Sequence, residues 1–134
     1  MSETELATIT VDQFISAAPE KVWQALTTPE LHAQWWAPGD IAGVLGHRFH
    51  LEMPGRGPIP CEVVQVREPE LFVFAFNGTW TISWRLVAEG KGTRLFLEHS
   101  GFDLENDGDL FAFNRMGPGW RDKVMPRLAE LLAA

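Results

Sequence analysis

The fold is decided by one stretch of the sequence, residues 71–87, which reads LFVFAFNGTWTISWRLV. Two runs of strand-forming residues flank Asn77-Gly78, a dipeptide that tolerates positive φ and is typical of a tight hairpin turn. The runs predict antiparallel strands over 71–76 and 79–87. In the second run alternate residues share one apolar face: Trp80, Ile82, Trp84 and Leu86.

Further strands are predicted on both sides of this hairpin. Alternating apolar and polar residues indicate strands over 47–53, 59–67 and 93–100, with a loop over 54–58 and turns over 68–70 and 89–92. In the last of these strands Leu95, Leu97 and His99 share a face, so His99 is expected to point toward the interior. The orientation of Glu62 stays open, because apolar neighbours at both parities favour opposite registers of its strand.

The sequence before residue 40 predicts one strand and two short helices. Residues 8–15 alternate as a strand does, and Pro19 suits the first position of a helix. Thr28-Pro29-Glu30 has the capping hydroxyl, proline and acid of a second helix start, and Pro38-Gly39 is expected to end that helix.

The C-terminal residues predict one long amphipathic helix. Trp120, Val124, Leu128 and Leu131 recur at helical spacing, and Pro126 should kink the helix or leave a carbonyl free. Residues 101–119 are polar and contain glycine, so they are expected to be irregular. The predicted order is β-αα-βββββ-α, an α+β fold in which the helix covers a curved antiparallel six-stranded sheet.

Composition bounds the function. The length of 134 residues suits a single domain over 1–134. The net charge of −7 excludes a basic surface that binds the phosphates of nucleic acid. The longest apolar run, 71–76, is far shorter than the roughly 20 residues of a membrane helix, so no membrane insertion is expected. The acidic start and the lone Cys61 favour a cytoplasmic protein.

Metal and nucleophile chemistry find little support in the sequence. His47 and His50 fall on opposite faces of their strand, and the acidic loop 103–109 lacks the twelfth-position glutamate of a calcium loop. Cys61 has no base beside it in the sequence, and a small buried residue is the expected role. We expect no metal and no cofactor.

His99 and the aromatic residues are the remaining signal. An imidazole facing the interior can bind a ligand oxygen or move a proton, but it can equally be a core histidine bonded to a carbonyl. With nine Phe, six Trp and no Tyr, the apolar face is either a packed core or the lining of a cavity.

Several motifs resemble one known family. Residues 15–30 together with Gln34-Trp35-Trp36 are similar to the opening of the SRPBCC (START-related, helix-grip) superfamily. Residues 92–95, residues 99–102 and Gly119-Trp120 resemble its branch related to the activator of the heat-shock-protein-90 ATPase. The resemblance implies a helix-grip fold whose sheet wraps around the C-terminal helix and encloses a cavity.

The resemblance also implies a function. We expect binding of a hydrophobic or aromatic small molecule, for transport, sequestration or sensing. A cyclase- or hydrolase-like enzyme using His99 and a co-chaperone-like interaction module are the alternatives, and a homodimer or a chaperone partner stays open. The residues expected to line the cavity are Trp36, Phe49, Leu51, Met53, Phe74, Trp80, Trp84, Leu97, His99, Trp120 and Val124.

Overall fold

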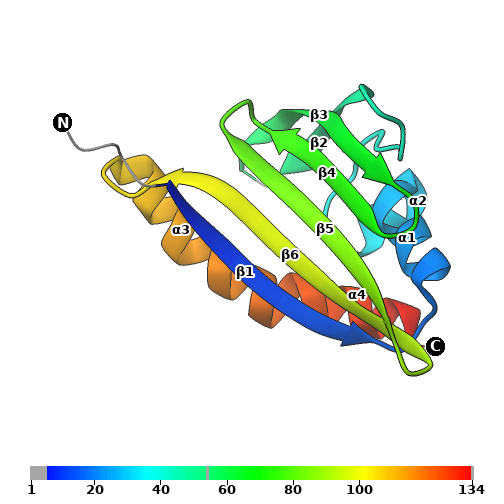
Figure 1. Cartoon of the computed structure of the whole chain (residues 1–134). Coiled ribbons are helices and arrows are strands. Elements are labelled where there is room, and N and C mark those ends of the chain that lie inside the picture. The colour runs from blue at the N-terminus through cyan, green and yellow to red at the C-terminus, as the bar shows by residue number, and fades with distance from the viewer. Residues whose placement is uncertain (1–5, 54, 134) are drawn as a thin grey trace.

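All strands of the described residues belong to one antiparallel sheet. The structure is a computed structural model that describes residues 6–53 and 55–133, so the acidic start Met1–Glu5 lies outside the described residues. The six strands follow the order β1-β6-β5-β4-β3-β2 across the sheet (Figure 1). They are β1 (Leu6–Ile15), β2 (Arg48–Met53), β3 (Gly57–Arg67), β4 (Leu71–Phe76), β5 (Trp80–Glu89) and β6 (Gly92–Asp103).

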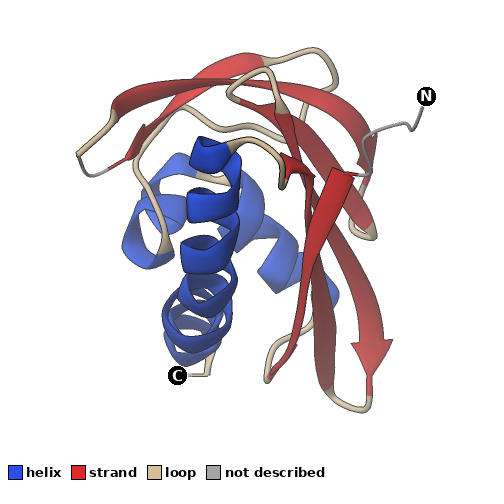
Figure 2. Ribbon diagram, turned by 90° about the vertical axis from the view of Figure 1, so that its left-hand side faces the viewer, coloured by secondary structure: helices blue, strands red, loops and turns tan. Residues whose placement is uncertain are grey.

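The helices all lie on one side of this sheet, which arches over them (Figure 2). They are α1 (Pro19–Thr27), α2 (Pro29–Trp35), α3 (Asp107–Gly119), the π-helical turn η1 (Trp120–Val124) and α4 (Met125–Leu132). The last three follow one another without a break and form the long C-terminal helix. The predicted α+β fold and its element order are confirmed. Among the described residues no helix is long and apolar enough to cross a membrane.

The hairpin of residues 71–87 forms as predicted. Asn77 and Gly78 both have positive φ, at 60° and 72°, and Phe76 pairs with Trp80 across the turn. Trp84 and Ile82 are fully buried on the inner face of β5, and Leu97 and His99 are buried on the inner face of β6. The alternation in the sequence therefore identified the face of the sheet that meets the helices.

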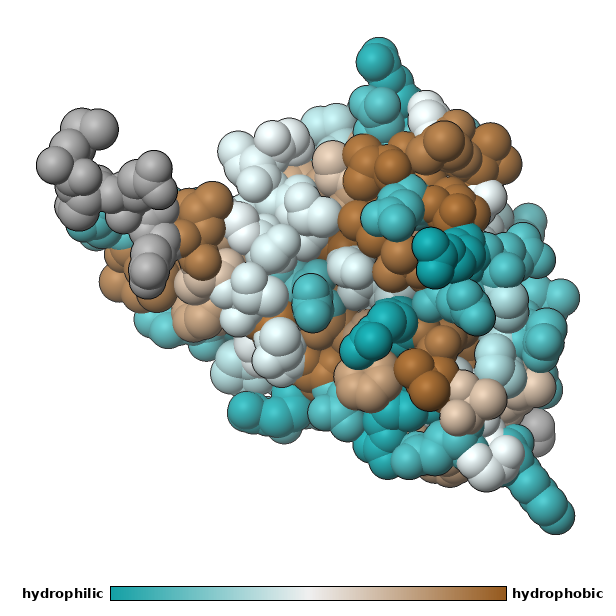
Figure 3. All heavy atoms as spheres, viewed as in Figure 1, coloured by the Kyte–Doolittle hydropathy of each residue, from teal (hydrophilic) through white to brown (hydrophobic). Residues whose placement is uncertain are grey.

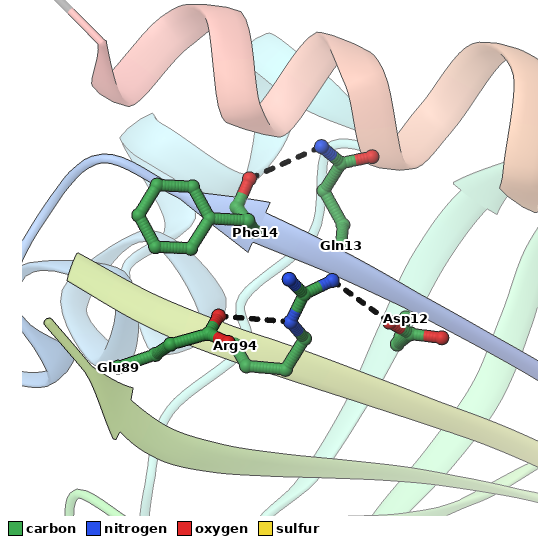
Figure 4. Close-up of polar contacts among 5 residues, drawn as sticks. All are labelled: Asp12, Gln13, Phe14, Glu89 and Arg94. Carbon is green, nitrogen blue, oxygen red and sulfur yellow. Dashed lines mark hydrogen bonds and ion pairs between the residues drawn. The ribbon is translucent and has the colours of Figure 1, made fainter.

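The outer face of the sheet carries charged groups. Arg94 of β6 donates from Nε to Glu89 and from Nη1 to Asp12 of β1, each at 2.9 Å, and its guanidinium lies over the ring of Phe14 (Figure 4). Glu62, left open by the sequence, also lies on this side. It pairs with Arg48 at 3.4 Å, while its neighbours Cys61 and Val63 are buried.

Residues 101–119 were expected to be irregular, and this expectation was wrong. Gly101 has a φ of 99° at a bulge, where a side chain would meet the carbonyl of Thr79, and β6 runs on to Asp103. The acidic loop then caps α3, because the Asn106 side chain accepts the Asp109 N–H at 3.0 Å and the Asp109 carboxylate accepts the Asp103 N–H at 2.8 Å. Capping and packing outweigh the poor helix propensity of the segment.

Pro126 is accommodated by a widened turn. A proline cannot donate an N–H and its ring crowds the preceding turn of an α-helix. Directly ahead of it, the Met125 N–H bonds to the Trp120 carbonyl, five residues back, and 120–124 form the π-helical turn η1. The Trp120 side chain is buried there, and Val124 is half-buried.

Most exposed apolar side chains lie near two parts of the fold, and Figure 3 shows apolar atoms interspersed with polar ones over one face of the molecule. One group lies where β1 and α3 begin: Leu6, Leu104, Leu110 and Phe111. The other lies beside β3: Val44, Leu45 and Val64. Phe14 of β1 and Val87 of β5 are exposed as well.

Candidate functional site

A cavity of about 510 Å³ lies between the C-terminal helix and the inner face of the sheet. The helix side is formed by Phe111, Ala112, Arg115, Met116 and Gly119 of α3 and by Trp120 and Val124 of η1. The opposite side is formed by Trp36, Met53, Arg56, Phe76 and His99. The cavity is therefore bounded by segments far apart in the sequence.

Helical geometry explains the wall on the α3 side. Ala112, Met116 and Gly119 are spaced four and three residues apart, so they lie on one face of the helix. That face packs toward the sheet, since Ala112 is buried and the neighbouring ring of Phe113 meets Phe102 of β6 edge-on, at 5.4 Å between centroids.

Aromatic rings form the apolar walls. Trp36 lies at the end of α2, and its ring centroid is 4.6 Å from that of Trp120. It also stacks on Phe76, with 6.0 Å between ring centroids and an interplanar angle of 22°. Trp36 is half-buried, whereas Phe76 and Trp120 are buried. The three rings leave flat apolar surfaces beside the cavity, and such surfaces are typical of sites for small apolar molecules.

His99 provides a buried polar group in the same cavity, with 1% of its surface exposed. The indole Nε1–H of Trp120 donates to Nδ1 of His99 across 3.1 Å. Because an indole N–H can only donate, Nδ1 is the acceptor and the neutral ring carries its proton on Nε2. Burial lowers the pKa of His99 to about 4, so the ring is neutral at pH 7. Its Nε2 has no protein partner within the described residues.

His32, in α2, is a second buried histidine beside the cavity wall. Its Nδ1–H donates to the Ala37 carbonyl at 2.6 Å, and its ring lies 5.2 Å from that of Trp36. Burial lowers its pKa to about 4, partly offset by this hydrogen bond. His32 does not line the cavity, and it holds the chain that leads from α2 past Trp36.

Two arginines are the charged residues of the lining. Arg56 lies in the loop between β2 and β3, and Arg115 lies on α3 with its guanidinium 5.1 Å from the centre of the Phe111 ring. Both arginines and Phe111 are exposed, and we call these three residues the rim of the cavity. His99, Phe76 and Trp120 are buried, and we call them its floor. No carboxylate of the described residues lines the cavity.

The structure places the residues expected from the sequence in two groups. Those that line the cavity are Trp36, Met53, His99, Trp120 and Val124. The others are buried in the core beneath it: Phe49, Leu51, Phe74, Trp80, Trp84 and Leu97. The groups are in contact, since Trp84 meets Trp120 edge-on at 5.6 Å and Trp80 meets His99 edge-on at 5.5 Å.

The α3 wall, the rim and Phe76 were not predicted from the sequence. The α3 residues were missed because 101–119 were expected to be irregular, although the spacing of Ala112, Met116 and Gly119 is a helical signal. Phe76 continues the alternation of its strand and could have been included with Phe74. Arg56 sits in a loop, where no periodicity indicates which side a residue faces.

Other reactive groups of the chain lie elsewhere. Burial raises the pKa of Cys61 to about 12, which keeps its thiol protonated and unreactive. His47 bonds through Nε2 to the Asp40 carbonyl at 2.7 Å and stacks on Phe49. Within the described ranges no three His, Cys, Asp or Glu residues come together as metal ligands.

A curved antiparallel sheet that closes on a long C-terminal helix, with a cavity between them, defines the helix-grip class of proteins. Comparison with family models is more specific. The model of the Activator of Hsp90 ATPase homolog 1-like protein family matches residues 16–133. The chain belongs to this family, as the resemblance of its motifs implied. No curated protein matches it.

Solved structures from bacteria share this fold over nearly the whole chain. Protein BH1534 from Bacillus halodurans is 32% identical, with a TM-score of 0.85 and coverage of 97% of this chain and 99% of that one. Protein MLL2253 from Mesorhizobium loti is 29% identical, with a TM-score of 0.85 and coverage of 94% and 96%. The Aha1 dimer from Colwellia psychrerythraea is 23% identical, with a TM-score of 0.75 and coverage of 94% and 93%, and it shows likeness of fold.

Proposed function

We propose that the protein binds a hydrophobic or aromatic small molecule in the cavity between α3–η1 and the sheet. The observation that carries this proposal is the combination of flat aromatic walls with one buried, unpartnered polar group, His99 Nε2. The volume of about 510 Å³ falls within the roughly 300–1,000 Å³ of ordinary ligand sites.

The buried N–H argues for an occupant rather than for an empty gap in the core. A buried donor without a partner costs about 1–3 kcal/mol, because it has lost its hydrogen bonds to water. Nε2 is covered in the structure, so a ligand oxygen reaches it only when the neighbouring side chains move; the hydrogen bond from Nε2–H would then remove this cost, while the ligand's rings or methylene groups cover Trp36 and Trp120. The expected ligand is thus apolar over most of its surface, and a ligand that also carries an oxygen acceptor at its inner end gains this hydrogen bond in addition.

The alternative function is an enzyme that uses His99 in catalysis. A general base needs a free lone pair, but Nδ1 of His99 is occupied by Trp120 and Nε2 carries the proton. In this tautomer His99 can donate a hydrogen bond to a carbonyl and polarise it. The described lining supplies no carboxylate to share a proton with it. The geometry therefore supports binding better than turnover.

The test is direct titration of the protein with three chemical classes: a flavonoid (naringenin), an anthraquinone polyketide (emodin) and a fatty acid (dodecanoate). Saturable quenching of tryptophan fluorescence, a raised Tm and recovery of the compound unchanged are expected for at least one class. Quenching is expected because Trp36 and Trp120 lie in the walls. Absence of binding by all three would overturn the proposal, and conversion of a bound compound would favour the enzymatic alternative.

A further inference from the structure

The charge at the rim runs against that of the rest of the chain. The protein has 11 Lys and Arg against 18 Asp and Glu, a net charge of −7. Among the described residues, the charged side chains that line the cavity are nevertheless both cationic, Arg56 and Arg115. A positive entrance to an apolar cavity on an acidic protein attracts anions and disfavours cations.

Within the described residues these two arginines have no carboxylate partner, a property that they share with Arg67, Arg85 and Arg127 but not with every arginine of the surface. Arg48, Arg94 and Arg121 each pair with a carboxylate, at 3.4, 2.9 and 3.0 Å. Within residues 6–53 and 55–133, neither Arg56 nor Arg115 has an ion pair. Their guanidinium groups keep their donors available for a carboxylate, which a guanidinium binds with two parallel hydrogen bonds.

Exposure along the cavity gives it two distinct ends. The rim is exposed and cationic, and Phe111 under the Arg115 guanidinium is 56% exposed. The floor is buried and apolar apart from His99, with Phe76 and Trp120 exposed by 3% and 4%. A molecule that fits both ends has an apolar body and one charged end.

We propose that the ligand is a hydrophobic carboxylate, held by its body between Trp36, Phe76 and Trp120 and by its charged group between Arg56 and Arg115. This inference rests on the proposed function, since it names the chemical class that the cavity takes. The carboxylate stays at the rim, where water still reaches it, so its charge is never fully desolvated. The apolar body supplies most of the affinity, and the arginines select the charged compound.

The experiment compares acids with alcohols of the same carbon skeleton. Calorimetric titration at pH 7.5 would measure dodecanoate against 1-dodecanol and 2-naphthoate against 2-naphthylmethanol. Each pair differs in charge and hardly in apolar surface. We expect the acid to bind about tenfold more tightly than the alcohol, and added salt to weaken the acid alone.

Variants of the two arginines test whether the preference for the acid arises at the rim. Arg56→Met with Arg115→Met keeps an unbranched apolar stem at each position and removes both charges, and it should erase the preference for the acid without weakening the alcohol. Arg67→Met with Arg127→Met is the matched control, because it also removes two exposed cations and neither of them lines the cavity. This control should keep the preference.

The possible outcomes separate the inference from the function on which it rests. Equal affinity for acid and alcohol in the unchanged protein, or a preference that survives in the double variant, would overturn the inference and leave the binding function standing. Loss of the preference in Arg67→Met with Arg127→Met would also overturn it, since net charge would then be the cause. Failure of all four compounds to bind would overturn the inference together with the proposed function.

Discussion

The indole of Trp120 and the imidazole of His99 form one hydrogen-bonded unit, with Trp120 Nε1 donating to His99 Nδ1 across 3.1 Å. This bond joins η1 to the inner face of β6 and sets the tautomer of the imidazole. Nε2 then carries the proton, at a position where the described residues offer it no acceptor. One contact thus links the position of the helix to the hydrogen-bonding character of the cavity.

Replacing Trp120 by Phe should reveal the energy of this bond. The variant removes the donor and leaves Nδ1 of His99 buried without a partner. Trp80→Phe is the matched control, because it deletes the same atoms from a buried indole whose Nε1 is unpartnered within the described residues. Trp120→Phe should cost about 1–2 kcal/mol more of unfolding free energy than Trp80→Phe, measured in urea. Equal losses would contradict this account of the bond.

Stability should fall in mild acid because of the two buried histidines. Burial lowers the pKa of His32 and of His99 to about 4, whereas an unfolded histidine titrates near 6.5. Between these values the unfolded chain binds more protons, so stability is full above about pH 6.5 and declines until about pH 4. Each histidine contributes a decline of up to about 3 kcal/mol.

Carboxylates also change the unfolding free energy in acid, and the variant His99→Gln separates the contribution of this histidine from theirs. The loss of unfolding free energy between pH 7 and pH 4.5 should be about 2–3 kcal/mol smaller in this variant than in the unchanged protein. Denaturant unfolding at the two pH values measures both losses. Identical losses would mean that His99 is protonated as readily in the folded protein as in the unfolded chain.

Val124→Trp should fill the cavity. Val124 is half-buried in the cavity wall, so an indole placed there can occupy space that the core does not use. Binding of any confirmed ligand should be lost, at a cost of about 1–3 kcal/mol of stability from overpacking. Val64→Trp is the control, because Val64 is 49% exposed on β3 and does not line the cavity. Calorimetric titration that found unchanged affinity in Val124→Trp would place the ligand elsewhere.

Trp84→Ala tests the division between core and cavity. Trp84 is fully buried and meets Trp35 and Trp120 edge-on at 5.7 and 5.6 Å. Its loss should cost about 3–5 kcal/mol of unfolding free energy, because the neighbouring rings cannot collapse into the space. Trp36→Ala, at the half-buried wall, should cost less stability and more ligand affinity. The reverse ranking would show that Trp84, and not Trp36, borders open space.

Some elements of the fold are predicted by local sequence patterns, and others depend on tertiary packing. Strand alternation is local, so it identified the inner faces of β5 and β6 and with them the direction of Trp84 and His99. The helix α3 is different, since Gly108, Gly117 and Pro118 weaken its propensity and it forms through the Asn106 cap and its packing on β6. Tertiary packing of this kind leaves a weaker trace in the sequence than alternation does.

The division of the aromatic residues between cavity wall and core is likewise not a local property. Trp80 and His99 are both buried on the inner face of the sheet, yet His99 lines the cavity and Trp80 does not. The distinction depends on where the C-terminal helix crosses the strands. Alternation predicts which way a side chain points, but it carries no information on what stands opposite.

The widened turn η1 has a consequence for comparing this chain with its relatives. A turn closed by a bond over five residues contains one residue more than an α-helical turn, so α4 is rotated by about 100° relative to an uninterrupted helix. Against a homologue whose last helix is α-helical throughout, the correct alignment therefore has a one-residue gap within 120–124. Placed before Trp120 or after Leu128, that gap would assign one of these two residues to the wrong counterpart, so the two halves of the helix must be aligned separately.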